Sequence, residues 1–130
     1  MNIKRSVDIE DEIRKALDPY VQAYVRPLPA NFSTPSVLIE MTGGTSKNTI
    51  DTFVVKLSSR ASTDADALEL MRNVIGILEA QTDAQIGALR YTTQNSLASW
   101  GSDPARPDLK LCTATVLVTA HRSSLEITES

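Results

Sequence analysis

The pattern of apolar and polar positions is clearest in Thr63–Gln81, where it repeats with the period of a helix. Ser62 or Thr63 is placed to cap the first turn, and Asp64 and Asp66 follow where the helix dipole favours negative charge. Such a broad apolar stripe needs a flat apolar partner, so we predict a helix on one face of a sheet rather than in a small bundle. The stripe consists of Ala67, Leu68, Leu70, Met71, Val74, Ile75, Ile77 and Leu78.

A shorter helix is predicted at Ser6–Asp18, with acidic residues in its first half and basic residues later, as the helix dipole favours. The Asp18–Pro19 step turns the chain away from helical geometry. Alternation over Val21–Val25 then predicts a short strand, and prolines mark Arg26–Thr34 as a loop that cannot be a central strand. The apolar positions of the helix are Ile9, Ile13, Ala16, Leu17 and Tyr20.

Alternation with period two predicts a hairpin in the next part of the chain. Ser36–Met41 and Thr49–Ser58 each place apolar residues at every second position. Thr42–Asn48, between them, contains two adjacent glycines among polar residues, which is typical of a flexible turn. The two segments are therefore predicted to pair as antiparallel strands.

A second, longer hairpin is predicted after the long helix. Ile86–Thr93 and Ser96–Trp100 alternate as one strand, interrupted by a bulge or bend at Thr92–Asn95. Gly101–Asp108 is a tight polar loop with two prolines, and Leu109–Arg122 is the longest strand. One face of this strand is threonine-rich and open to solvent or to another subunit. The other face is small and apolar and suits the underside of a helix, with Cys112, Ala114, Val116, Val118 and Ala120.

This order of elements predicts an α+β fold with a mainly antiparallel sheet, two helices packed on it and a long C-terminal hairpin. The length of 130 residues is enough for one domain with a real core, which we place at residues 1–122. Ser123–Ser130 has little core-forming potential and is predicted to be a mobile tail.

Composition narrows the class of function. The net charge of −3 gives no basic footprint for nucleic acid. A single cysteine excludes an internal disulfide and a cysteine-rich zinc site. We expect no membrane span, because no apolar run is long enough, and no signal peptide, because Met1–Arg14 is charged throughout. Synthesis in the cytoplasm is the resulting expectation.

Few residues suggest chemistry, and each has a simpler explanation. Gly43–Lys47 resembles a phosphate loop but lacks its spacing and is not followed by a helix, so a hairpin turn is favoured. His121, the only histidine, would need a nucleophile and an orienting carboxylate in reach for catalysis. The nearby Ser123 and Ser124 lie in a terminal segment expected to fray, so a solvated strand end is favoured. Cys112 is expected to be a buried thiol with little thiolate.

Two charged groups are candidate contact surfaces. Asp103, Arg106 and Asp108 flank two prolines and form either a rigid polar turn with weak ion pairs or, with Trp100 at its base, a binding surface. The acidic start of the first helix is either a solvated face or a patch for a basic partner. This acidic group consists of Asp8, Glu10, Asp11 and Glu12.

The pattern and order of these elements resemble the tail terminators, also called tail completion proteins, of long-tailed bacteriophages. The resemblance covers "VDIEDEIRKAL", "SVLIEMTGG", "DTFVVKLSSRAS", "DADALELMRNVIGIL" and "WGSDPARPDLKLCTATVLVTAH". The turn at Asp103–Pro104, followed by the long last strand, contributes most to it. None of these segments is a catalytic fingerprint.

The resemblance implies a structural virion protein at the head-proximal end of the tail, made in the host cytoplasm. It implies a ring, commonly a hexamer, that caps the tail tube, stops its polymerisation and joins it to the head or neck connector. DNA then passes through the lumen without specific binding, and the family brings neither a cofactor nor catalytic residues. The expected subunit or partner contacts are Trp100, Asp103, Arg106, Asp108, Thr45 and Lys47.

Three other interpretations remain open. Head-closure or neck connector proteins share this size and composition, and an adaptor of another tail-like or secretion machine would share the ring. A small-molecule-binding or enzymatic domain would need a pocket between helices and sheet, lined by Arg90, Tyr91, Arg106 and His121. For the ring itself, we expect acidic residues along the lumen, because basic ones would bind DNA phosphates. The candidates are Glu40, Asp51 and the first helix.

Overall fold

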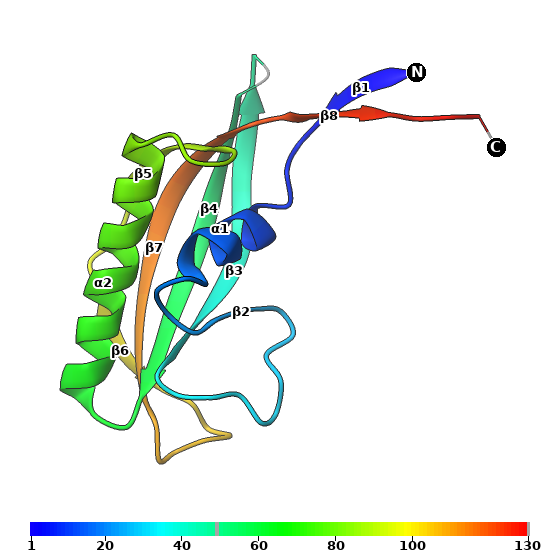
Figure 1. Ribbon diagram of the computed structural model, residues 1–130. Helices are drawn as coiled ribbons and strands as arrows, with labels where there is room; N and C mark the ends of the chain where they lie inside the picture. Colours follow the sequence, from blue (N-terminus) through cyan, green and yellow to red (C-terminus); the bar gives the residue numbers. More distant parts are fainter. Residues whose placement is uncertain (49, 130) are drawn as a thin grey trace.

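The long strand β7 organises the main sheet, which has six strands. The computed structural model describes residues 1–48 and 50–129. β7 pairs with β4 on one side and with both β5 and β6 on the other, and the sheet order is β2-β3-β4-β7-β5 (Figure 1). All these pairings are antiparallel except the parallel pair β2–β3. The elements are β1 (Asn2–Arg5), α1 (Ile9–Leu17), β2 (Ala23–Val25), β3 (Ser36–Lys47), β4 (Ile50–Ala61), α2 (Asp64–Asp83), β5 (Leu89–Gln94), β6 (Ser99–Ser102), β7 (Lys110–His121) and β8 (Ser123–Glu126).

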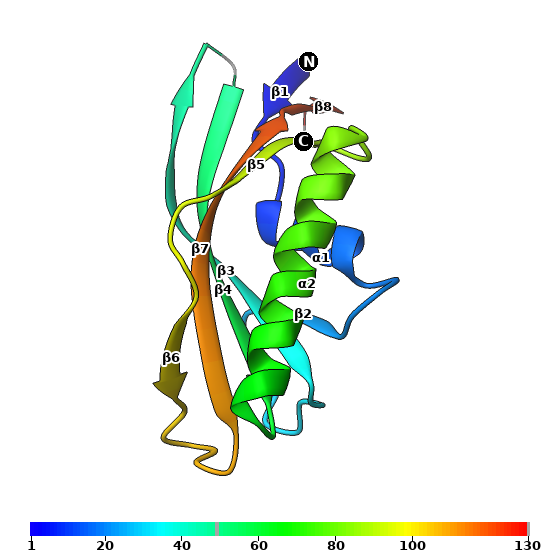
Figure 2. The same cartoon turned by 90° about the vertical axis from the view of Figure 1, so that its left-hand side faces the viewer.

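Both helices lie on the same face of this sheet, as Figure 2 shows, and the predicted α+β fold is confirmed. The small apolar positions of β7 are buried beneath the helices, as the alternation predicted. α2 adds its apolar stripe to this core, and Ser59 Oγ ties β4 to the helix by donating to the carbonyl of Ala67 at 2.7 Å. The core therefore forms a single layer between the sheet and the helices.

The capping residues Asp8 and Thr63 determine where the two helices begin. Thr63 Oγ1 accepts a hydrogen bond from the amide of Asp66 at 3.1 Å, so α2 begins one residue later than predicted. Asp8 caps α1 by accepting from the amide of Asp11 at 3.3 Å. The predicted start at Ser6 is wrong, because the segment before Asp8 leads out of β1 instead.

The first hairpin is longer than the sequence predicted. The segment expected to be a flexible turn continues as strand, and β3 pairs with β4 as far as Lys47 and Ile50. A register shift between Met41 and Gly43 leaves Thr42 as the extra residue of a bulge. Gly44 then passes so close to β4 that an added Cβ would lie 2.4 Å from the carbonyl oxygen of Thr52, which explains a glycine within the strand. Thr49, the first residue of the predicted second strand, lies outside the described residues.

The interrupted strand before the last hairpin is two strands. β5 and β6 both pair with β7, so Gln94 lies opposite Val116 and Ser99 opposite Thr113. Four residues, 95–98, therefore span the distance covered by two residues of β7. The predicted interruption is present, and it lies slightly later than the predicted Thr92–Asn95.

Two loops are tied together at one end of the sheet. Two guanidinium groups contact the ring of Phe32, which lies in the proline-marked loop. The distance to the ring centre is 5.8 Å from Arg60 and 5.4 Å from Arg106. Arg60 also forms an ion pair with Asp103 at 3.2 Å. These contacts fix the loop before β3 against the loop before β7.

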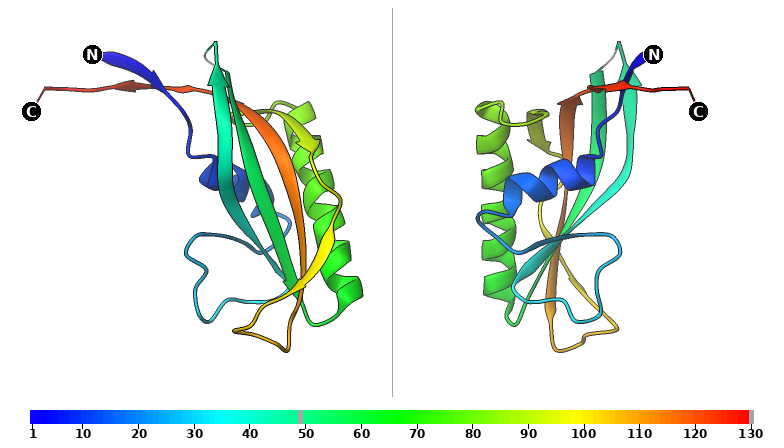
Figure 3. Two further views of the ribbon diagram at one scale, coloured as in Figure 1. Left: turned by 180° about the vertical axis from the view of Figure 1, so that it is seen from behind. Right: turned by 45° about the vertical axis from the view of Figure 1, so that its right-hand side comes forward.

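The two ends of the chain form a separate ribbon. β1 pairs antiparallel with β8, with Ile3 opposite Leu125, and this ribbon projects beyond the β3 edge of the sheet (Figure 3). We call residues 1–5 and 123–127 the terminal arm. The sequence prediction contained no strand in either segment, and it assigned residues 123–130 to a mobile tail; Ser130 lies outside the described residues. No helix among the described residues is long and apolar enough to cross a membrane.

Candidate functional site

The terminal arm leaves the domain at a partly buried ion pair between Arg122 and Asp51. Arg122, directly after β7, places its Nε 3.3 and 3.2 Å from the two carboxylate oxygens of Asp51 in β4, and its Nη2 3.1 Å from Oδ1. Ser6, between β1 and α1, donates its hydroxyl to Asp51 Oδ2 at 2.7 Å. Ser46 Oγ in β3 accepts from Arg122 Nη2. This root cluster of Ser6, Ser46, Asp51 and Arg122 therefore holds both strands of the arm where they depart.

The electrostatics of the root cluster favour anchoring. Hydrogen bonds from Arg122 first, and then from the hydroxyls of Ser6 and Ser46, lower the pKa of Asp51 from its usual 3.8 to about 2. The residue is only 3% exposed. A carboxylate with this pKa and with its oxygens occupied is a weak proton acceptor at neutral pH. The cluster is therefore built to hold a geometry rather than to transfer protons.

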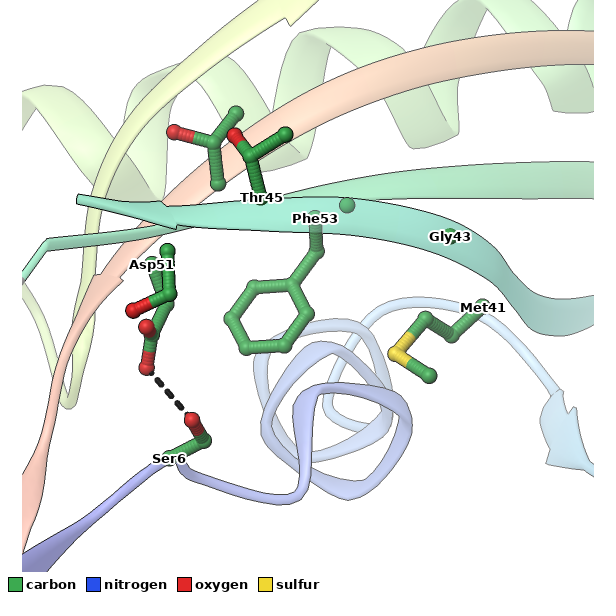
Figure 4. Close-up of a pocket in the computed structure, with 9 residues that line it drawn as sticks. Ser6, Met41, Gly43, Thr45, Asp51 and Phe53 are labelled. Carbon is green, nitrogen blue, oxygen red and sulfur yellow. Dashed lines mark hydrogen bonds between the residues drawn. The ribbon is translucent and has the colours of Figure 1, made fainter.

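A groove of about 340 Å³ adjoins the root cluster on the helix side of the first hairpin. Figure 4 shows the ring of Phe53 and the side chain of Met41 on the same side of β3 as the hydrogen bond between Ser6 and Asp51. No residue of α1 lines this groove. Its lining is Ser6, Met41, Gly43, Gly44, Thr45, Ser46, Asp51, Thr52 and Phe53. Because the one charged lining residue is already paired, the groove suits an apolar side chain better than a charged ligand.

The face of the sheet turned away from the helices carries a second candidate surface. Its β7 positions are only half-buried, alternating with the buried ones, and its β4 positions include Val54 and Lys56. No described helix lies over this bare face (Figure 2). One solvated face is common in antiparallel sheets, so this feature alone does not identify a partner. The β7 residues concerned are Leu111, Thr113, Thr115, Leu117 and Thr119.

The outer edge of the sheet carries large exposed apolar side chains. Tyr91 lies on β5, Leu97 in the break between β5 and β6, and Trp100 on β6. Their exposed fractions are 61%, 85% and 53%. These side chains are spread along the edge, because Tyr91 lies opposite Thr119 and Trp100 opposite Cys112. We infer that the edge is a candidate contact surface.

The predicted contact residues are divided between two ends of the sheet. Asp103 forms its ion pair with Arg60, and Arg106 forms one with Asp108 at 3.1 Å, so both have roles inside the chain. Thr45 and Lys47 lie at the tip of the first hairpin, exposed to solvent. Thr45 lies opposite Thr52 of β4, and Asp103 is paired with Arg60 of β4. These two β4 residues are eight positions apart, which is roughly 26 Å along the strand. The structure does not bring the six residues together, and their contacts with other subunits stay a prediction.

The residues expected to line a small-molecule pocket do not converge. Tyr91 and His121 lie near the end of β7, whereas Arg106 lies in the loop before its start. Eleven steps along β7 separate these ends by about 36 Å. Arg90 turns back to donate to the carbonyls of Gly87 and Leu89. The predicted pocket lined by these four residues is therefore wrong.

Of the acidic residues expected along a lumen, Asp51 is corrected, and the others stay a prediction. Asp51 is buried and paired, so it presents no free charge to a channel. In α1, Asp11 is paired with Arg14 at 2.6 Å, and Glu10 is paired with Arg26. Glu40 remains on the bare face, opposite Lys56. The charge of the first helix is thus largely balanced by its neighbours.

Two expectations about single residues are confirmed. His121 is exposed at the end of β7. Cys112 is fully buried, and desolvation raises the pKa of its thiol despite the nearby hydroxyl of Ser59. Among the described residues, no three His, Cys, Asp or Glu side chains come close enough to hold a metal ion.

Sequence reasoning missed the root cluster and the arm. A signal for the arm was present, because Met1 and Ile3 alternate with polar residues, as do Leu125 and Ile127. Asp51 and Arg122 are separated by 71 residues, and no local pattern links them.

No protein-family model matches this chain, and no curated protein matches it.

Proposed function

We propose that this protein is a structural subunit that assembles head-to-tail into a ring and terminates the tail tube of a long-tailed bacteriophage. The supporting observation is the terminal arm, an ordered ribbon with apolar residues that extends away from the core. A two-stranded ribbon is marginally stable in water by itself, so a second surface is needed to bury it. An arm at one side of a subunit is suited to reach the next one.

The exposed edge of Tyr91, Leu97 and Trp100 supports the same proposal. The sheet order puts this edge on the opposite side from β3, beyond which the arm projects. Unlike patches on opposite sides of a subunit make a heterologous contact, which closes into a ring when the rotation per subunit divides a full turn. The two patches therefore fit a ring better than a two-fold dimer.

The more specific role, tail termination, rests on the resemblance of the element order to tail terminators. In this role one face of the ring binds the last layer of the tail tube protein and the other binds the head or neck connector. DNA passes through the lumen without specific binding, in keeping with the net charge of −3. Hexamer is the expected stoichiometry.

Assembly can be measured directly. Light scattering over a wide range of concentration, together with electron microscopy of negatively stained protein, should show rings. Trp100→Ser should raise the concentration needed for half-assembly at least tenfold. Tyr20→Ser, in the α1–β2 turn at a site 64% exposed against 53% for Trp100, should not change it. A monomer at every concentration, with and without tail tube protein as template, contradicts the proposal.

The terminating role needs a second measurement. Added to polymerising tail tube protein, the subunit should shorten the tubes and appear at one end of each. Binding to a head connector without binding to the tube would instead identify a neck protein built on the same ring.

A further inference from the structure

The terminal arm has one apolar face. The pairing of Ile3 with Leu125, and the period of two along each strand, place Met1 and Ile127 on the same face as these two residues. Met1 is 75% exposed and Ile127 is 41% exposed. The same period places Arg5 at the inner end of this face, and the opposite face carries Asn2, Lys4, Ser124 and Glu126. Covering the apolar face requires a groove that accepts a ribbon.

Such a groove lies on the far side of the same chain. It has a volume of about 290 Å³ and runs between α2 and the segment that joins β5 to β6. Met71 and Ile75 form its floor, with Gln94 and Ala98 on the strand side. Gly76 exposes the backbone of α2 here, because nothing lies within 4 Å of the position its Cβ would take. A ribbon can therefore approach the helix closely.

The charges of the two surfaces are complementary. Lys4 and Arg5 on the arm form no ion pair with any described residue, and the same is true of Glu79 on the rim of the groove. Glu126, the acidic residue of β8, is already paired with the amino group of Met1 at 2.9 Å. The arm thus offers net positive charge beside its apolar face. The groove offers an unpaired carboxylate beside its apolar floor, and the guanidinium of Arg72, which also lines the groove, is paired with Glu69 at 3.7 Å.

The positions of the two surfaces decide between self-contact and contact between copies. The arm projects beyond the β3 edge of the sheet, whereas α2 and the β5–β6 segment lie at the other edge, as Figures 1 and 3 show. Since the root cluster fixes the direction in which the arm leaves, its own groove is out of reach. The occupant that fits is the arm of a second copy.

We propose that the arm of each subunit docks into the groove beside α2 of the next subunit. Ile3 and Leu125 then face Ile75 and Gly76, and Arg5, on the same face of the arm, lies near Glu79. This inference rests on the proposed head-to-tail assembly and names its contact. It also assigns the root cluster a role, which is to aim the arm.

Disulfide cross-linking between two different chains tests the contact. One chain carries Ile3→Cys, and the other carries Gly76→Cys and is enriched in ¹⁵N so that mass spectrometry separates mixed dimers from like pairs. Native Cys112 can stay, because it is fully buried and its pKa is raised. As a matched control, the second chain carries Thr45→Cys at the exposed hairpin tip. After mild oxidation, mixed dimers should be at least tenfold more abundant with Gly76→Cys than with Thr45→Cys.

The outcomes separate this inference from the proposed function. Rings without the Gly76 cross-link overturn the docking site and leave ring assembly standing. The Gly76 cross-link in open chains that never close supports the docking and overturns the ring. Glu79→Lys should reduce the cross-link, and adding Arg5→Glu to the arm should restore it. A cross-link that is indifferent to these charge changes contradicts the assigned orientation of the arm.

Discussion

Two guanidinium nitrogens of Arg122 donate hydrogen bonds to the carboxylate of Asp51, although the two residues are 71 positions apart in the sequence. Arg122 lies between β7 and β8. Ser6 donates to the same carboxylate from the other strand of the arm. A guanidinium fork restricts both distance and direction, which a single point charge would not do. The relationship therefore fixes the angle at which the chain leaves the sheet.

The first prediction concerns acid stability. Because the folded-state pKa of Asp51 is lowered to about 2 from 3.8, its contribution to stability is complete above pH 4 and is lost as the pH falls towards 2. Asp51→Asn keeps the shape and removes this dependence. Between pH 5 and pH 2, the unfolding free energy of the native chain should fall by about 2 kcal/mol more than that of the variant, measured by urea denaturation. Parallel curves for the two chains would contradict the assigned ion pair.

The second prediction concerns the two adjacent glycines of β3, Gly43 and Gly44. In Gly44→Ala the new methyl group would lie 2.4 Å from the carbonyl oxygen of Thr52, so the backbone of one strand must move. We expect a loss of about 1–3 kcal/mol in unfolding free energy. Gly43→Ala is the matched control, because nothing lies within 4 Å of its Cβ position, and it should change stability by about 0.5 kcal/mol or less. Equal effects of the two variants would show that β3 does not run beside β4 as described.

The third prediction concerns a buried hydroxyl. Thr92 Oγ1 is buried without a hydrogen-bond partner among the described residues. Thr92→Val keeps the shape and removes the unpaired group, so stability should stay the same or rise by about 1 kcal/mol. Thr82→Val is the control, because its hydroxyl donates to the carbonyl of Glu79 at 3.0 Å, and it should cost about 1 kcal/mol. Thermal unfolding followed by circular dichroism would measure both, and a destabilised Thr92→Val would reveal a hidden partner.

Local periodicity was enough to predict the layer of helices and strands. The apolar stripe of α2 and the alternation of β7 each repeat over many residues, so each segment is consistent with a single type of secondary structure. Thr63 was one of two candidate caps, with Ser62, because capping depends on residues only three positions apart, and the structure selects Thr63. The exposed position of Trp100 also agrees with its proposed use as a contact residue, although that use is still a prediction.

The rest depends on contacts between distant residues. Glycines are depleted in strands, so the segment through Gly43 and Gly44 was predicted as a turn, whereas pairing with β4 outweighs this local preference. The arm pairs Ile3 with Leu125 from opposite ends of the chain, and each strand alone is too short to give a clear signal. The root cluster likewise depends on which strands become neighbours, and composition does not encode that.

The bulge in β3 has a consequence for chain length. Met41 pairs with Val55 and Gly43 with Val54, so Thr42 is a spare residue in the ladder. A chain shortened by deletion of Thr42 would keep every later pairing, including the one that puts Ser46 beside Asp51. One further residue lost, or one gained without a second bulge, would rotate Ser46 to the opposite side and detach it from Arg122. This hairpin can therefore absorb the loss of a single residue in evolution but not the loss of two.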